Sequence, residues 1–191
     1  MAVQPGRHQL GPDHGRIILR TSRDGLAATA GHDLTIEATR WSGVLAVNED
    51  LSPAGLDVHI DLGALVVREG TGGVKPLSDR DRREIAVTAR KTLAADRYPE
   101  AVFAASTFAP AAASGGEISG TLTLHGETRP LRLRVTQTGP DRYHAEATVV
   151  QTDYGIKPYS GFLGALRVRD AVEVAVDVDL SQRADGAGAA Q

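Results

Sequence analysis

The stretch EISGTLTLHGETRPLRLRVTQ, residues 117–137, decides the fold. Apolar and polar side chains alternate along residues 118–124 and again along residues 131–136, which is typical of strands with one dry face and one solvated face. The connection HGETRP, residues 125–130, contains a glycine and a proline, which favour a turn followed by the start of a strand. The stretch therefore predicts a β-hairpin whose apolar face must be covered by other strands.

The same period-two alternation recurs along most of the chain and predicts about eight antiparallel strands. In the longest of them the parity slips at Arg40 and Trp41, which predicts a bend. An open sheet of this size would leave two unpaired edges, whereas closure into a barrel removes them. The predicted fold is therefore all-β with one helix, an antiparallel β-barrel of about eight strands. The predicted strands are residues 16–23, 32–47, 57–62, 100–108, 118–124, 131–136, 142–151 and 171–180.

One segment, residues 78–95, departs from the strand pattern. Ser78 is a good helix N-cap, and Asp81 follows three residues later in the manner of a capping box. Apolar residues then recur at Ile85, Ala89 and Leu93, a helical spacing. The segment therefore predicts the one helix of the fold, with charged residues on its other face.

The two ends of the chain lack this periodicity. Residues 1–15 contain glycine and proline and predict an extended lead-in. Residues 181–191 are rich in alanine and glycine and predict a disordered tail. Residues 16–180 are thus expected to form a single barrel domain, with loops at residues 68–77 and 109–116.

Composition excludes several classes of function. The 21 Lys and Arg residues against 24 Asp and Glu give a net charge of -3, which provides no electrostatic footprint for nucleic acid. The chain has no cysteine, so disulfides, thiolate nucleophiles and cysteine metal sites are excluded. We see neither an apolar secretion signal nor a run long enough to span a bilayer, so we expect no integral membrane segment and a cytoplasmic location.

Catalytic and metal-binding patterns are missing from the sequence. The six histidines are scattered, and none belongs to a motif with metal-ligand spacing. His32 and Asp33 are neighbours in a predicted strand and therefore point to opposite faces, which argues against a proton relay. His125, in the hairpin connection, is expected to be solvated or to bond within the turn. We expect no catalysis, no metal and no cofactor.

The interior of a barrel is lined by the inward parity of each strand. These side chains are aliphatic, and they either contact an apolar ligand or fill a solidly packed barrel; the sequence leaves both alternatives open. The candidates are Ile36, Val58, Ile60, Leu122, Leu124, Leu133, Val135, Val149, Val174 and Val176.

Three motifs, YPEAVF at residues 98–103, GTLTLHGETRP at residues 120–130 and DYGI at residues 153–156, resemble the YceI-like family in order and spacing. The resemblance implies a lipocalin-like barrel, capped by the helix, with a cavity that takes a long isoprenoid or other lipid tail. Many members of that family are exported to the periplasm. The larger candidate ligand contacts near these motifs are Phe103, Phe108, Tyr154 and Ile156.

Two functions follow as hypotheses. The first is binding and sequestration, or transport, of a long apolar ligand such as an isoprenoid, an isoprenoid quinone or another lipid. The second is a filled barrel that acts as a structural or interaction module, with a possible homodimer.

Overall fold

The computed structural model describes residues 4–111 and 115–181. The predicted tail from residue 182 onward, and residues 112–114 of a predicted loop, lie outside this part. The longest helix is α1 (Asp79–Thr92), and three short 3-10 helices are η1 (Ala28–Ala30), η2 (Gln151–Tyr154) and η3 (Phe162–Gly164). The strands are β1 (Gly6–Leu10), β2 (Gly15–Thr21), β3 (Arg23–Asp24), β4 (Asp33–Ala38), β5 (Trp41–Val47), β6 (Pro53–Asp61), β7 (Leu65–Thr71), β8 (Glu100–Ala111), β9 (Gly115–Leu124), β10 (Glu127–Gly139), β11 (Arg142–Val150), β12 (Ser160–Gly161), β13 (Leu166–Val168) and β14 (Ala171–Asp179).

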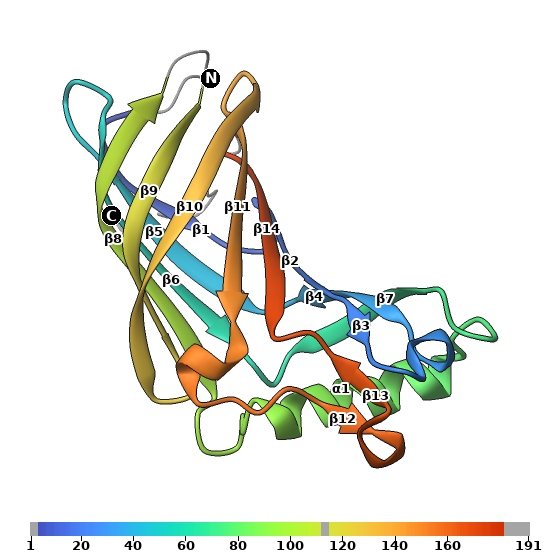
Figure 1. Ribbon diagram of the computed structural model, residues 1–191. Coiled ribbons are helices and arrows are strands. Elements are labelled where there is room, and N and C mark those ends of the chain that lie inside the picture. Colours follow the sequence, from blue (N-terminus) through green and yellow to red (C-terminus); the bar gives the residue numbers. More distant parts are fainter. Residues whose placement is uncertain (1–3, 112–114, 182–191) are drawn as a thin grey trace, which may run out of the picture.

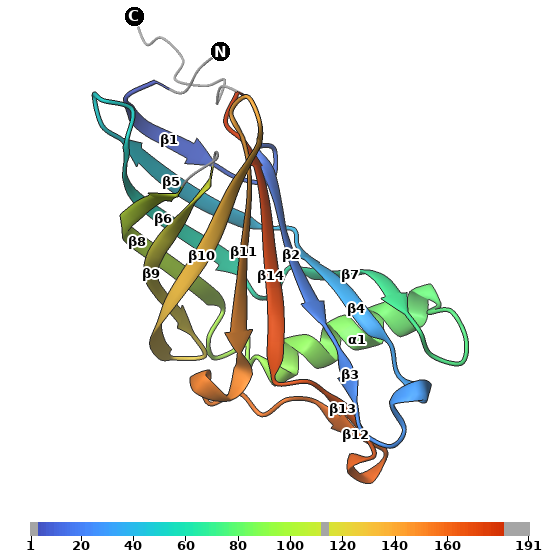
Figure 2. The same cartoon turned by 45° about the horizontal axis from the view of Figure 1, so that its top comes forward.

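Eleven of these strands form one strongly curled antiparallel sheet, with the order β1-β5-β6-β8-β9-β10-β11-β14-β2-β4-β7 (Figures 1 and 2). Strands β4 and β5 follow one another directly, yet β4 pairs with β2 at one flank of the sheet and β5 pairs with β6 at the other. The bent β4–β5 strand therefore closes the curl into a barrel. Counting β1–β2, β4–β5 and β6–β7 each as one bent strand gives eight barrel strands in the described part, as predicted.

The bend itself keeps its hydrogen bonds. The Thr39 N–H donates to the Ala64 carbonyl oxygen at 3.0 Å, and the Asp61 N–H donates to the Arg40 carbonyl oxygen at 3.0 Å. These bonds continue the β4–β7 and β5–β6 ladders across the residues where the parity slips. The predicted bend is therefore confirmed at residues 39–40, and no backbone pairing is lost there.

The central hairpin is formed by β9 and β10, but its connection is shorter than predicted. Only His125 and Gly126 lie between the strands, and both have positive φ, +54° and +83°. A two-residue turn of this kind matches the right-handed twist of the flanking strands. The expected six-residue connection was wrong, because β10 already begins at Glu127 and carries Pro130 opposite Thr121.

Other boundaries also differ from those predicted. Residues 6–10 of the expected lead-in form β1, which pairs with β5. Strand β7 extends to Thr71, into the expected glycine-rich loop. Strands β8 and β9 pair as far as Ala111 and Gly115, so most of the expected loop at residues 109–116 is sheet. Residues 109–116 are rich in alanine and glycine, and pairing with a neighbouring strand overrides such weak local preferences.

Helix α1 is confirmed together with its cap. The Ser78 side chain accepts a hydrogen bond from the Asp81 N–H at 3.2 Å, and the Asp81 carboxylate accepts one from the Ser78 N–H at 2.9 Å. This reciprocal capping box satisfies two backbone donors at the start of the helix. The helix packs along β7 and lies across one end of the barrel, beside a small sheet with the order β12-β13-β3 (Figure 1).

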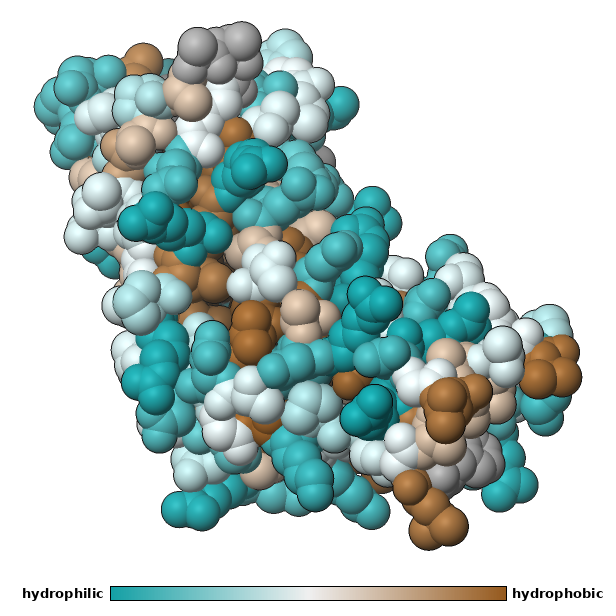
Figure 3. All heavy atoms as spheres, viewed as in Figure 1, coloured by the Kyte–Doolittle hydropathy of each residue, from teal (hydrophilic) through white to brown (hydrophobic). Residues whose placement is uncertain are grey.

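Two apolar clusters stabilise the barrel. One gathers Phe103, Leu122 and Ile156, and the other gathers Ile17 and Trp41. Val58, Ile60, Leu93 and Val174 contact both clusters, so the interior is continuous. On the outside, hydrophilic residues cover much of the face in Figure 3, and hydrophobic residues protrude mainly from the lobe beside α1.

Gly120 lies where β9 approaches β8 closely, and a substitution there tests how tightly the two strands pack. A Cβ at Gly120 would clash with the backbone carbonyl oxygen of Ala104 and would press on the Phe103 ring. We predict that Gly120→Ala lowers the free energy of unfolding by about 1–3 kcal/mol, because the neighbouring strand must shift. Gly139→Ala is the matched control, since only the Arg142 side chain lies near its Cβ position. Urea unfolding of both variants measures the difference, and equal losses would contradict the interpretation.

On the outer surface, His144 of β11 lies between two carboxylates. Its Nδ1 is 2.7 Å from Asp177 of β14, the cross-strand neighbour, and its Nε2 is 3.2 Å from Glu146. Hydrogen bonding to Asp177 first, and then to Glu146, raises the pKa of His144 above its ordinary value. The protonated ring therefore stabilises the fold below the ordinary pKa of about 6.5, and this contribution is lost as the pH rises through the raised pKa.

We predict that His144→Gln lowers the free energy of unfolding by about 0.5 kcal/mol near pH 5.5, a small value because the pair is solvated. Near pH 9 the variant and the wild type are expected to be equally stable, since the imidazole is then neutral. Denaturant titrations at the two pH values measure this, and a difference that is constant with pH would contradict the role of the charged ring.

Candidate functional site

The barrel encloses a cavity of about 1460 Å³. Its wall runs from the tips of the hairpins, at Leu51 and Tyr143, to α1 and the small sheet at the opposite end, at Ile85 and Leu166. The volume exceeds the roughly 300–1,000 Å³ of an ordinary small-molecule site. Because the cavity runs from one end of the barrel to the other, it can accommodate an extended molecule along the barrel.

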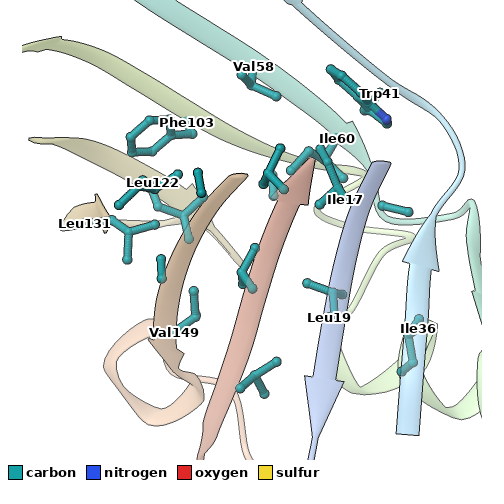
Figure 4. Close-up of a pocket in the computed structure, with 18 of the residues that line it drawn as sticks. Ile17, Leu19, Ile36, Trp41, Val58, Ile60, Phe103, Leu122, Leu131 and Val149 are labelled. Atoms are coloured by element: carbon teal, nitrogen blue, oxygen red, sulfur yellow. The ribbon is translucent and has the colours of Figure 1, made fainter. Parts of the chain in front are cut away.

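Thirteen of the fourteen candidate ligand contacts lie on this wall. Figure 4 shows labelled side chains from strands on both sides of the barrel, among them Ile36, Phe103 and Val149, around one interior space. The strand parity thus brings the predicted aliphatic residues together, and their contact with a ligand stays a prediction. The candidates on the wall are Ile36, Val58, Ile60, Phe103, Phe108, Leu122, Leu124, Leu133, Val135, Val149, Ile156, Val174 and Val176.

Tyr154 is the exception, because its side chain packs in the core and is not part of the cavity wall. It lies in η2, where the chain leaves the strand period and coils, and it is 3% exposed. Burial raises the pKa of its phenol. Tyr154 therefore contributes to packing beside Ile156 and lies off the cavity wall, and its contact with a ligand stays a prediction.

The η2 segment is fastened to the turn of the central hairpin. His125 Nδ1 and the Tyr154 carbonyl oxygen are 3.1 Å apart, and Arg129 Nε donates to the Asp153 carbonyl oxygen at 3.1 Å. The His125 ring also lies against Tyr98, with ring centroids 4.9 Å apart. His125 thus joins η2 to the hairpin, so it bonds beyond its own turn.

Several wall residues were missed by the sequence reasoning. Ile17 and Leu19 of β2 alternate in the same parity as the predicted lining, so their signal was present. Trp41 follows the bend, where the parity is lost, and was hidden for that reason. Ile85 and Ala89 lie on the predicted apolar face of α1, which the structure turns toward the cavity. Leu166 and Val168 of β13 also line the cavity, but a strand of three residues is too short to show an alternating pattern in the sequence.

Polar side chains occur mainly at the two ends of the cavity. At the α1 end the Arg23 guanidinium donates to the Gly31 carbonyl oxygen at 2.6 Å, and His32 Nε2 lies 2.8 Å from the Lys75 carbonyl oxygen. The buried polar side chain of the described wall is Gln151, which directly follows β11 at this same end of the barrel, and its amide donates to the Arg169 carbonyl oxygen at 3.0 Å. These three groups bond the protein's own backbone, and the strands between the two ends of the cavity present chiefly aliphatic side chains.

The described residues contain neither a metal-ion cluster nor a helix that could span a bilayer. No group of three or more His, Asp or Glu side chains there is arranged to hold a metal ion. No helix of that part of the chain has the length and hydropathy needed to cross a bilayer.

Several solved structures resemble this fold. One is BcnA of Burkholderia cenocepacia, with a TM-score of 0.58, 15% sequence identity, and coverage of 86% of this chain and 94% of that chain. Another is a YceI protein of Campylobacter jejuni, with a TM-score of 0.55, 14% identity, and coverage of 75% and 81%. At these identities the likeness concerns the fold alone, the curled sheet with its interior. No curated protein matches the sequence.

A family comparison gives the assignment that these structures alone do not. The model of the YceI-like domain matches residues 9–180, which include every strand of the barrel except part of β1. The motifs at residues 98–103, 120–130 and 153–156 all fall within this match. The chain therefore belongs to the YceI-like family.

Proposed function

We propose that the protein binds a long apolar molecule inside the barrel, such as an isoprenoid, an isoprenoid quinone or another lipid. It sequesters or carries this molecule without changing it chemically. The observation that carries the proposal is the cavity of about 1460 Å³ with an aliphatic wall. A filled structural barrel would leave no such volume, so the cavity favours the binding role over the second hypothesis.

The energetics of apolar burial support an extended ligand. Removing apolar surface from water contributes about 25 cal/mol per Å², so burial of about 300 Å² contributes roughly 7–8 kcal/mol. This approaches the roughly 8 kcal/mol of a micromolar complex. A few isoprene units would provide that area with few polar contacts, and the wall offers few.

The wall also argues against a reaction on the ligand. The aliphatic strands place no nucleophile beside a base along the middle of the described cavity, and the Gln151 amide is already bonded to backbone. An enzyme needs a polar constellation at the reacting atom. A carrier needs only volume and apolar surface, which the barrel supplies.

We predict that the purified protein carries a co-purified amphiphile. Native mass spectrometry should show a mass above that of the chain, and solvent extraction should release the extra component. Delipidated protein should then take up a long isoprenoid alcohol such as solanesol at about micromolar concentration. Protein that is consistently empty and also takes up no solanesol would contradict the proposal.

A second prediction concerns the wall itself. Val174 lies opposite Leu19 and Ala147 and contacts both apolar clusters. We predict that Val174→Trp reduces uptake of solanesol about tenfold, because the indole occupies the space that the ligand needs. The matched control is Glu173→Trp, on the exposed outer face of the same strand.

Circular dichroism tests whether both tryptophan variants remain folded. Uptake is then measured by fluorescence competition with an apolar dye. Loss of uptake in Val174→Trp alone supports the proposal. Normal uptake in that variant, or an equal loss in both, would contradict the assignment of this wall to ligand binding.

A further inference from the structure

Three apolar side chains project into solvent from one lobe of the molecule. Leu26 and Leu163 are fully exposed, and Val74 is 86% exposed. We define the loop lobe as residues 23–33, 72–77 and 157–170. Figures 1 and 2 show its strands β3, β12 and β13 gathered beside α1, and Figure 3 shows hydrophobic residues protruding there.

The three segments of the loop lobe are held against one another. The Ala27 N–H donates to the Ala165 carbonyl oxygen at 2.8 Å, which ties the Leu26 loop to the Leu163 loop. Gly72 packs so closely on the Arg23 guanidinium that a Cβ would clash with it, which ties in the Val74 loop. The apolar tips are therefore fixed on one structural unit.

The loop lobe borders one end of the cavity. Each of its segments contributes to the wall, through His32, Lys75 and Leu166 respectively. Leu26, Val74 and Leu163 themselves are not part of that wall. The three tips therefore lie off the cavity wall, so cavity packing does not account for their apolar character.

The backbone at Leu163 adds a second observation. Its φ of +53° and ψ of +33° place a leucine in the left-handed region, which disfavours any residue with a Cβ. Glycine would occupy this position more readily. At Leu163, therefore, neither the backbone conformation nor burial accounts for the leucine side chain.

Charge is distributed unevenly over the loop lobe. Four of its cationic residues are exposed: Lys75, Lys157, Arg167 and Arg169. Of its three aspartates, Asp24 is exposed, whereas Asp33 and Asp170 are half-buried and accept hydrogen bonds from the Arg23 and Thr152 N–H groups. The lobe is therefore positive at its surface, although the whole chain has a net charge of -3. Cations beside apolar tips are the combination that binds anionic lipid surfaces.

We propose that the loop lobe docks on an anionic lipid bilayer, with Leu26, Val74 and Leu163 inserted among the head groups. This goes beyond the proposed function, because it assigns the surface through which an apolar ligand passes between bilayer and barrel. A stable protein partner would cover about 800 Å² of this surface, whereas three separate tips suit insertion between lipid head groups.

Sedimentation with sucrose-loaded vesicles tests the proposal on the full chain. The wild type should bind vesicles of phosphatidylcholine with about a quarter phosphatidylglycerol, more weakly without the anionic lipid and more weakly at high salt. The triple variant Leu26→Ser/Val74→Ser/Leu163→Ser should bind at least about tenfold more weakly. Its cavity content by native mass spectrometry should stay unchanged, since the three residues lie off the wall.

A matched pair of single variants provides the control. Val74→Ser should weaken vesicle binding about threefold. Val87→Ser makes the same chemical change on α1, at a side chain that is 52% exposed and off the cavity wall, and should leave binding unchanged. Wild-type protein that fails to sediment, or equal losses in Val74→Ser and Val87→Ser, would overturn the proposal.

Other outcomes separate the two proposals. If the triple variant alters the elution volume in gel filtration and vesicle binding is absent, the tips serve a contact between two copies, and membrane docking is refuted. Protein that is loaded with lipid but ignores vesicles also refutes docking alone. Protein that binds vesicles but is empty and takes up no solanesol supports docking and refutes the carrier role.

Discussion

The continuity of the chain through the bend at residues 39–40 is the constraint on which the rest of the structure depends. Strands β4 and β5 form one bent strand, with β4 paired to β2 at one flank of the sheet and β5 paired to β6 at the other, and the bonds of Thr39 with Ala64 and of Asp61 with Arg40 continue its ladder across the bend. One bent strand thus serves both flanks, and no long edge is left to solvent along the described barrel wall. Closure then converts the apolar face of every strand into an interior.

The size of the inward side chains determines how much of the interior stays open. Only 4% of the residues are aromatic, so the wall is made chiefly of Leu, Ile, Val and Ala. Such side chains shield the backbone from water but do not reach the axis of the barrel. Phe103 is accommodated because Gly120 leaves room for its ring. The interior thus stays open although each strand is well packed against its neighbours.

Features with a strong local cause could be predicted from the sequence. The central hairpin, the capped helix at Ser78 and the inward parity of Val174 and Val176 each follow from a repeating pattern or a defined motif. Because closure aligns all inward parities, correct parity also placed the ten aliphatic strand candidates on the wall. No local pattern in the sequence identifies a ligand. An aliphatic wall would favour a class of apolar molecules and would not select one molecule among them.

The features that could not be predicted depend on partners distant in the sequence. Strand β1 forms because it can pair with β5. The short β13 is held in place because the Val168 N–H donates to the Tyr159 carbonyl oxygen and the Arg169 N–H donates to the Ser22 carbonyl oxygen. The position of Tyr154 off the cavity wall has a related cause. Its parity ends where η2 coils under the hairpin turn, and that coil is stabilised by bonds to His125 and Arg129. Neither bond can be predicted from the sequence around Tyr154, because both partners lie more than twenty residues away.

Trp41 gives the barrel a property of a different kind. It is the single tryptophan of the chain, it is 8% exposed, and it lies on the cavity wall just after the bend. Indole emission depends on the polarity of its surroundings and is quenched by electron-accepting rings in contact with it. The molecule therefore contains one intrinsic optical reporter of the polarity of its own interior.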